Sequence, residues 1–203
     1  MAHHRVIPLL LLAVLGLLTL GFAILALTMS PNSADLAVHN GTDETFSAHQ
    51  FSIQLTDTQA GTSGKTQSSV RVIDFNAPNH LQVYRASPQL HLLGSVHGGA
   101  VVTAINEYAA VTGGSSGWVR HGSHFDRTET LAAYALRLGQ KTVANGTVAE
   151  TAVVRSGYLV ADVLVLRIKN ATGPNGQTAV GGTAQETLHL LRINGAKAPA
   201  VNS

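Results

Sequence analysis

The chain has 203 residues, a formal net charge of +2, a hydrophobic share of 45% and no cysteine. This length allows one domain of ordinary size plus an anchor. The missing cysteine excludes disulfides, thiolate metal ligands and a cysteine nucleophile. The basic residues are scattered and form no stripe, so we expect no nucleic-acid partner.

The first predicted element is an uncharged apolar run over residues 6–29. A helix rises about 1.5 Å per residue, so this run can cross a hydrocarbon core about 30 Å thick. The alternative is a cleaved signal peptide, whose apolar region is normally about 7–15 residues and ends at a small-residue cleavage site. The run is longer than that, and residues 27–35 offer no such site. We therefore predict a retained single-pass transmembrane helix.

Charge around this helix predicts its orientation in the cell membrane. Arg5 precedes the run, and the next basic residue is Lys65. Because basic residues favour the cytoplasmic side, residues 1–5 should form a cytoplasmic N-terminus and the rest should lie outside. We expect a tether at 30–34, an exported β-rich domain at 35–195 and a C-terminal tail at 196–203.

The exported domain begins with a weak helical signal and continues with period-two alternation. A short helix over residues 34–45 is expected to be interrupted at Asn40-Gly41. From Phe51 onward, apolar and polar residues alternate as in half-buried strands. Strands are expected at 51–55, 70–75, 81–83, 90–96, 100–111 and 118–121, and their short connections favour antiparallel pairing.

A second helix is predicted over residues 126–138. Asp126 and Glu129 have the spacing of a capping box, Leu131, Ala135 and Leu138 share one helical face, and Gly139 can end the helix. Further strands are expected at 148–155, 158–169 and 186–193. The predicted fold class is therefore α+β, mostly antiparallel β: a curved sheet or half-barrel with one or two packed helices.

The order of these elements resembles the lipoprotein-carrier superfamily, which includes LolA-like domains and the actinobacterial envelope proteins similar to LprG and LppX. The resemblance is carried by the segments FSIQL (51–55), SSVRVIDFNAPNHLQVYR (68–85), GWVRHG (117–122), ETLAAYALRLG (129–139) and HLLRING (189–195). It implies a strongly bent antiparallel sheet whose hollow carries acyl chains. The chain departs from the lipoprotein members because a membrane helix stands where they have a lipobox cysteine.

Two functions follow as hypotheses, and neither is enzymatic. In the first, the exported domain binds lipid or another apolar ligand on its concave sheet, since a partly covered apolar sheet is a common ligand site. In the alternative, the domain is an anchored interaction or scaffold module that docks another envelope protein. The residues expected to line the ligand site are Phe51, Ile53, Leu55, Val70, Val72, Leu81, Val83, Leu131, Tyr134 and Leu138.

Other chemical signals are weaker, and we expect no catalytic residue, metal or cofactor. Residues 113–117 match G-x-S-x-G, but a strand follows the serine where a nucleophile elbow needs a helix. His121, His124 and Asp126 could supply zinc ligands, yet no second ligand pair stands at a suitable spacing. A hydrolase using Ser115 or this histidine pair is therefore the least favoured hypothesis.

Overall fold

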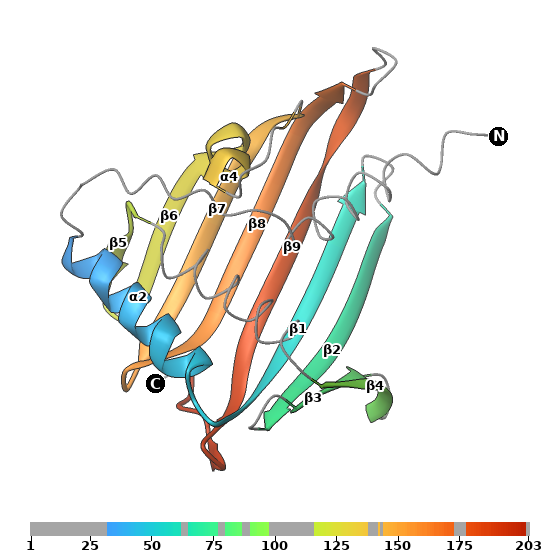
Figure 1. Ribbon diagram of the computed structural model, residues 1–203. Helices are drawn as coiled ribbons and strands as arrows, with labels where there is room; N and C mark the ends of the chain where they lie inside the picture. Colours follow the sequence, from blue (N-terminus) through green and yellow to red (C-terminus); the bar gives the residue numbers. More distant parts are fainter. Residues whose placement is uncertain are drawn as a thin grey trace.

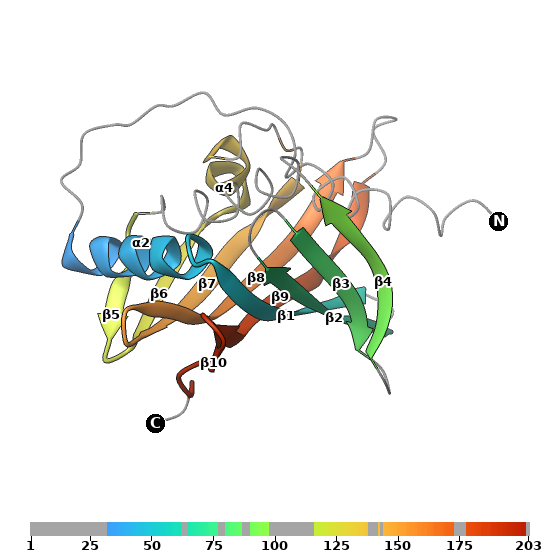
Figure 2. The same cartoon turned by 60° about the horizontal axis from the view of Figure 1, so that its bottom comes forward.

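The computed structural model describes residues 32–61, 65–76, 80–86, 90–97, 116–137, 142, 144–172 and 178–201. In this part of the chain, ten strands form one antiparallel sheet with two helices on its concave side (Figures 1 and 2). The strand order is β4-β3-β2-β1-β9-β8-β7-β6-β5, and β10 pairs with β9. The predicted α+β class and antiparallel curved sheet are confirmed.

The elements have the following bounds. The helices are α2 (Ser33–Phe46) and α4 (Leu131–Arg137). The strands are β1 (Gln50–Gly61), β2 (Thr66–Asn76), β3 (His80–Ala86), β4 (Leu90–His97), β5 (Val119–His121), β6 (His124–Thr130), β7 (Ala144–Arg155), β8 (Tyr158–Thr172), β9 (Thr178–Ile193) and β10 (Ala196–Lys197).

Helix α2 is continuous, so the predicted interruption at Asn40-Gly41 is wrong. Asn32 caps the helix by accepting the N–H groups of Ala34 and Asp35 at 2.9 and 2.8 Å. Glycine is tolerated at position 41 because the helix approaches the sheet closely there. A Cβ on Gly41 would lie 2.8 Å from Cγ1 of Val154. Tertiary packing outweighs the low helix propensity of glycine at this point.

The start of α2 also shortens the predicted tether. Ser33 and Ala34, which the sequence assigns to residues 30–34, lie in the first turn of the helix. The predicted anchor at 6–29 falls outside the described residues. Within the described ranges, no helix is long and apolar enough to cross a bilayer.

The second predicted helix starts five residues too early. Residues 126–130 belong to strand β6, which pairs with β7 from His124↔Val153 to Thr130↔Thr147, and α4 begins at Leu131. The spacing of Asp126 and Glu129 is therefore not a capping box. The residues Phe125, Arg127 and Glu129 alternate with Asp126, Thr128 and Thr130, which is the period of a strand.

Two-residue turns fix the register of the last strands. Ser156 and Gly157 join β7 to β8 with φ of 51° and 83°, and Asn194 and Gly195 join β9 to β10 with φ of 48° and 79°. Positive φ at both central residues is typical of the turn whose twist matches a tight antiparallel hairpin. These turns therefore set the pairing of β7 with β8 and of β9 with β10.

The C-terminal tail predicted at 196–203 is held to the sheet over its described part. Residues Ala196 and Lys197 form β10, and the N–H of Ala198 donates to the carbonyl of Leu191 at 3.0 Å. Arg155 donates from Nη2 to the carbonyl of Val201 at 3.0 Å. The described part of the tail thus packs on the C-terminal end of β9, next to the β7–β8 turn (Figure 2).

Candidate ligand-binding face

The concave face of the sheet is defined by the side chains that point toward α2 and α4. Phe46 at the end of α2 meets the ring of Phe51 edge-on at 5.5 Å, and Phe51 stacks on Phe75 of β2 at 4.9 Å between ring centroids. Because successive side chains alternate between faces, Ile53 and Leu55 lie on the same face as Phe51. The helices pack mainly on β6, β7 and β8, so the concave face of β9, β1 and β2 lies beside them.

Buried apolar residues form two clusters on this face. The first cluster joins α2 to the sheet, and the second joins α4 to it. The first includes Val38, Phe46, Phe51, Ile53, Phe125, Ala152, Leu159 and Leu188, with Leu55, Ile73 and Phe75 half-buried against it. The second consists of Leu131, Tyr134, Ala144, Val148 and Leu166, with Leu164, Ile168 and Ala184 half-buried against it.

A row of mainly charged residues crosses the sheet between the two apolar clusters. Its members stand directly opposite one another on five neighbouring strands: Arg127 (β6), Glu150 (β7), Leu164 (β8), Glu186 (β9) and Asp57 (β1). Arg71 of β2 extends the row, since its Nη2 donates to Asp57 Oδ2 at 2.7 Å. We call these residues, without Leu164, the polar belt. The concave face is therefore not uniformly apolar.

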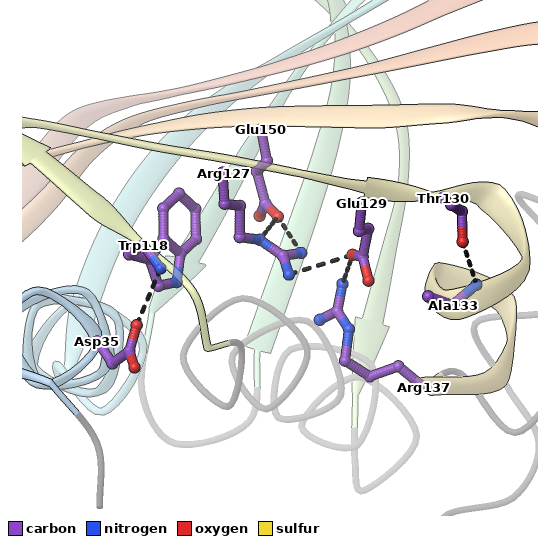
Figure 3. A network of polar contacts seen from close by, with 8 residues as sticks. All are labelled: Asp35, Trp118, Arg127, Glu129, Thr130, Ala133, Arg137 and Glu150. Atoms are coloured by element: carbon purple, nitrogen blue, oxygen red, sulfur yellow. Dashed lines mark hydrogen bonds and ion pairs between the residues drawn. The ribbon is translucent and has the colours of Figure 1, made fainter. Parts of the chain in front are cut away.

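The β6–β7 end of the polar belt is a buried and charge-balanced network (Figure 3). Arg127 donates from Nε to Glu150 at 2.6 Å and also contacts that carboxylate through Nη2. Glu129 lies 3.1 Å from Arg127 Nη1 and accepts from Arg137 of α4 at 2.5 Å. The side chains of Arg127 and Glu150 are only 6% and 4% exposed. Two guanidinium groups thus neutralise two carboxylates and tie α4 to the sheet.

The same network reaches α2 through the aromatic ring of Trp118. The Arg127 guanidinium lies 5.1 Å from the Trp118 ring centroid, a cation–π distance. The backbone N–H of Trp118 donates to Asp35 Oδ1 at 3.0 Å, and Trp118 itself is 2% exposed. In Figure 3, Trp118 lies between Asp35 of α2 and Arg127 of β6. The arrangement couples both helices to one buried arginine.

At the β9–β1 end, the described residues supply one guanidinium group for two carboxylates. Asp57 is paired with Arg71, and its side chain is 15% exposed. Its cross-strand neighbour Glu186 is half-buried on the same face. Burial raises the pKa of Glu186 to about 7, the negative charge of Asp57 adds to this effect, and Arg71 opposes it. This end of the belt therefore holds a carboxyl group that titrates near neutral pH.

Burial governs the other titratable groups between the two ends. Desolvation raises the pKa of Glu150, and the nearby Arg127 charge opposes that rise. Burial, reinforced by the negative charge of Glu150, raises the pKa of Tyr134 above its ordinary value. Tyr134 therefore presents a neutral hydroxyl close to the polar belt at neutral pH, where it can act as a hydrogen-bond donor.

The predicted lining residues separate into groups in the structure. Phe51, Ile53 and Leu55 lie together on the concave face. Leu131 and Tyr134 lie there as well, but in the second cluster. Val70 stands opposite Thr56 and Val72 stands opposite Gln54. The side chains of Val70 and Val72 therefore point to the convex face of the sheet. A ligand on the concave face would meet Ile73 and Phe75 in their place.

Of the three remaining predicted lining residues, Leu81 and Val83 are placed by backbone register alone and Leu138 is not described. The backbone register sets Leu81 opposite Phe75 and Val83 opposite Ile73. Leu138 lies outside the described residues, as do the serine at 115 and the strand expected at 100–111. These assignments stay predictions from the sequence.

The segment with His121, His124 and Asp126 does not form a metal-binding cluster. His121 Nε2 lies 4.0 Å from Asp126 Oδ2, and the two side chains are 64% and 48% exposed. Asp126 Oδ1 accepts from the hydroxyl of Thr151 at 2.6 Å on the convex side of β6. In the part of the chain that the structure describes, no three histidine, aspartate or glutamate side chains converge as a metal site would require.

Sequence reasoning missed the polar belt. Its members come from strands far apart in the chain, and the successive pairings from β6 through β7, β8 and β9 to β1 bring them into one row. The available signal was a charged residue in the middle of otherwise apolar alternation, as at Glu150 and Glu186. Such an inward charge in a strand marks a paired or functional group, because an unpaired buried charge is costly.

Among known proteins, the chain matches solved structures only. No family model matches the chain, and no curated protein matches it. Among solved structures, a LolA superfamily protein from Nitrosomonas europaea matches over 82% of this chain and 94% of its own, with 10% sequence identity and a TM-score of 0.28. The superfamily is the one that the sequence resembles. At this identity and TM-score, the match assigns no family membership and no activity.

Proposed function

We propose that the protein is a membrane-anchored extracytoplasmic domain that binds lipid or another apolar ligand on the concave face of its sheet. The observation that carries the proposal is the apolar surface of β1 and β2 beside the helices. There Leu55, Ile73 and Phe75 face inward and are only half-buried. Burying such surface under an acyl chain is favourable by about 25 cal/mol per Å².

The polar belt gives this surface a defined end. Along β1, the inward residues run from Phe51 through Ile53 and Leu55 to the charged Asp57. Phe51 and Ile53 are already buried by the chain's own side chains, at 2% and 6% exposure. An acyl chain that covers the half-buried Leu55 would meet the belt at Asp57 and Glu186. A ligand with an apolar chain and a polar end therefore fits this face better than a pure hydrocarbon, because the polar end avoids burying the carboxylates against hydrocarbon.

The anchored location supports the same proposal. An apolar run at 6–29 behind a basic N-terminus favours placement of the domain outside the cell membrane. A tethered domain can take a ligand from its own membrane or hold it there, but it cannot diffuse to a second membrane. The proposal therefore concerns binding or presentation and includes no enzymatic step.

One observation favours the alternative of an anchored interaction or scaffold module. The concave face at β6 and β7, toward the β5 edge of the sheet, is filled by the chain's own ion pairs, and α4 covers it. If the rest of the face were filled in the same way, the domain would act through its outer surface on another envelope protein.

Two neighbouring substitutions separate these functions. Leu55→Glu places a charge on the concave face, while Thr56→Glu places the same charge on the opposite face one residue later. The full chain is purified in mild detergent from its own host's membranes, and bound lipid is measured by native mass spectrometry. We expect lipid on the wild type and on Thr56→Glu, and its loss from Leu55→Glu. A wild-type chain without lipid would contradict the proposal and favour the scaffold module.

A further inference from the structure

The first turn of α2 and the edge strand β5 form one end of the domain. Asn32 donates from Nδ2 to the carbonyl of Trp118 at 3.5 Å, and the N–H of Trp118 donates to Asp35 at 3.0 Å. Figures 1 and 2 both show the start of α2 next to β5, at the side of the sheet away from β4. Val119, the residue after Trp118, therefore lies close to the point where the chain enters α2.

The chain length before α2 limits how far this end can lie from the proposed anchor. The apolar run ends at Met29, and Asn32 follows three residues later. A chain spans at most about 3.3–3.6 Å per residue, so Asn32 lies within roughly 10 Å of the end of the run. The polar headgroup layer on each side of a bilayer is itself roughly 5–7 Å thick. The first turn of α2 must then lie at or next to the membrane surface.

This end of the domain exposes apolar side chains that the fold does not use. Leu36 in the first turns of α2 is 43% exposed, and Val119 at the start of β5 is 55% exposed. Arg120, the middle residue of β5, is also exposed and points to the other face of the strand, over the ring of Phe125. The nearest exposed carboxylate, Asp126, is engaged by the Thr151 hydroxyl and lies 4.0 Å from His121. The edge strand thus carries an exposed apolar side chain on one face and a basic one on the other, and apolar and basic side chains together favour the headgroup layer of a membrane.

We propose that Leu36, Val119 and Arg120 form a membrane-facing edge that rests on the outer leaflet of the bilayer holding the anchor. The inference rests on the proposed anchorage and adds the orientation of the domain. The edge strand β5 is then close to the membrane and the opposite edge strand β4 is far from it. The sheet order separates these strands by eight steps, which at about 4.8 Å per step is up to roughly 38 Å.

The absence of cysteine allows a direct test by single-site labelling. Val119→Cys and Leu92→Cys are matched, because these side chains are 55% and 56% exposed and lie on opposite edge strands. Leu18→Cys reports on the anchor. Each full-length variant is labelled with an environment-sensitive fluorophore and placed in nanodiscs that contain lipids brominated near the top of the acyl chain. A far-UV circular dichroism spectrum unchanged from that of the wild type serves as the folding control for each variant.

We expect the label at position 119 to be quenched at least three-fold more strongly than the label at 92, and the label at 18 to be quenched as well. Equal quenching at 119 and 92, or stronger quenching at 92, together with a quenched label at 18, overturns the membrane-facing edge and leaves the anchor standing. An unquenched label at 18 overturns both the anchor and the membrane-facing edge.

Discussion

The two ends of the polar belt use the same residue types with different charge balance. At the β6–β7 end, Arg127 and Arg137 face Glu129 and Glu150, so positive and negative charges are equal. At the β9–β1 end, Arg71 is the one guanidinium group that faces Asp57 and Glu186 among the described residues. Arg127 and Glu150 at the first end are nearly inaccessible to solvent, whereas Arg71 and Glu186 at the second end are half-buried. The comparison suggests that the first end holds α4 in place and that the second is available to a ligand.

The largest expected effect comes from removing one member of the balanced end. Arg127→Met leaves Glu150 buried without its guanidinium partner, and breaking a buried pair in this way costs about 3–5 kcal/mol. Unfolding of the full chain by urea in non-ionic detergent, followed by the fluorescence of Trp118, measures the loss. The double variant Arg127→Met/Glu150→Leu is the control. It should recover most of the stability because no unpaired charge is left, and a double variant as unstable as the single one would contradict this assignment.

The unbalanced end should instead respond to pH. Glu186 has a pKa of about 7 in the folded protein, above the ordinary value of a glutamate. The folded state therefore binds the proton more tightly than the unfolded state. The stabilisation is complete below the ordinary pKa and is lost as pH rises through about 7. The loss is up to roughly 3 kcal/mol, reduced by solvent screening of a half-buried group.

Glu186→Gln isolates this contribution. The free energy of unfolding of the wild type should fall between pH 5 and pH 7.5 relative to that of the variant, since glutamine does not titrate. Urea unfolding at matched pH values measures both curves. Parallel curves for the wild type and the variant over this range would show that Glu186 does not titrate near neutrality.

A smaller effect is expected at the contact that seats α2. The Thr45 hydroxyl accepts the N–H of Leu159 at 2.9 Å and donates to the carbonyl of Gly41 at 2.8 Å, and all three groups are buried. Thr45→Val keeps the shape but leaves the N–H without a partner, which costs roughly 1–3 kcal/mol. Thr45→Ser keeps the hydroxyl and should be the more stable variant in urea unfolding. A serine variant weaker than the valine variant would mean that the methyl group, rather than the hydroxyl, matters here.

Much of the sheet could be predicted from local alternation. The strand at Phe51, Ile53 and Leu55 was predicted on the correct face because its other face is polar. In β2, both Val70 and Val72 on one side and Ile73 and Phe75 on the other are apolar, so alternation alone cannot choose the inward set. The structure resolves this through the ring contact of Phe51 with Phe75.

The helices were harder to predict because tertiary contacts decide them. Gly41 disfavours a helix locally, yet its missing side chain lets α2 lie close to Val154. Residues 126–130 show both the spacing of a capping box and the alternation of a strand. They form a strand because they pair with β7. The polar belt depends on residues of β1 and β9 that lie more than a hundred positions apart in sequence. No local pattern carries that information.

The most direct test of the central claim is photo-crosslinking with a lipid that carries a diazirine near the end of its acyl chain. The probe is incorporated into membranes that contain the full-length wild-type protein, and labelled peptides are mapped after irradiation. The account predicts labels on the half-buried inward residues of β1 and β2, namely Leu55, Ile73 and Phe75, in addition to the anchor at 6–29. Labels confined to the anchor, or labels on the opposite face at Val70 instead, would contradict lipid binding on the concave sheet.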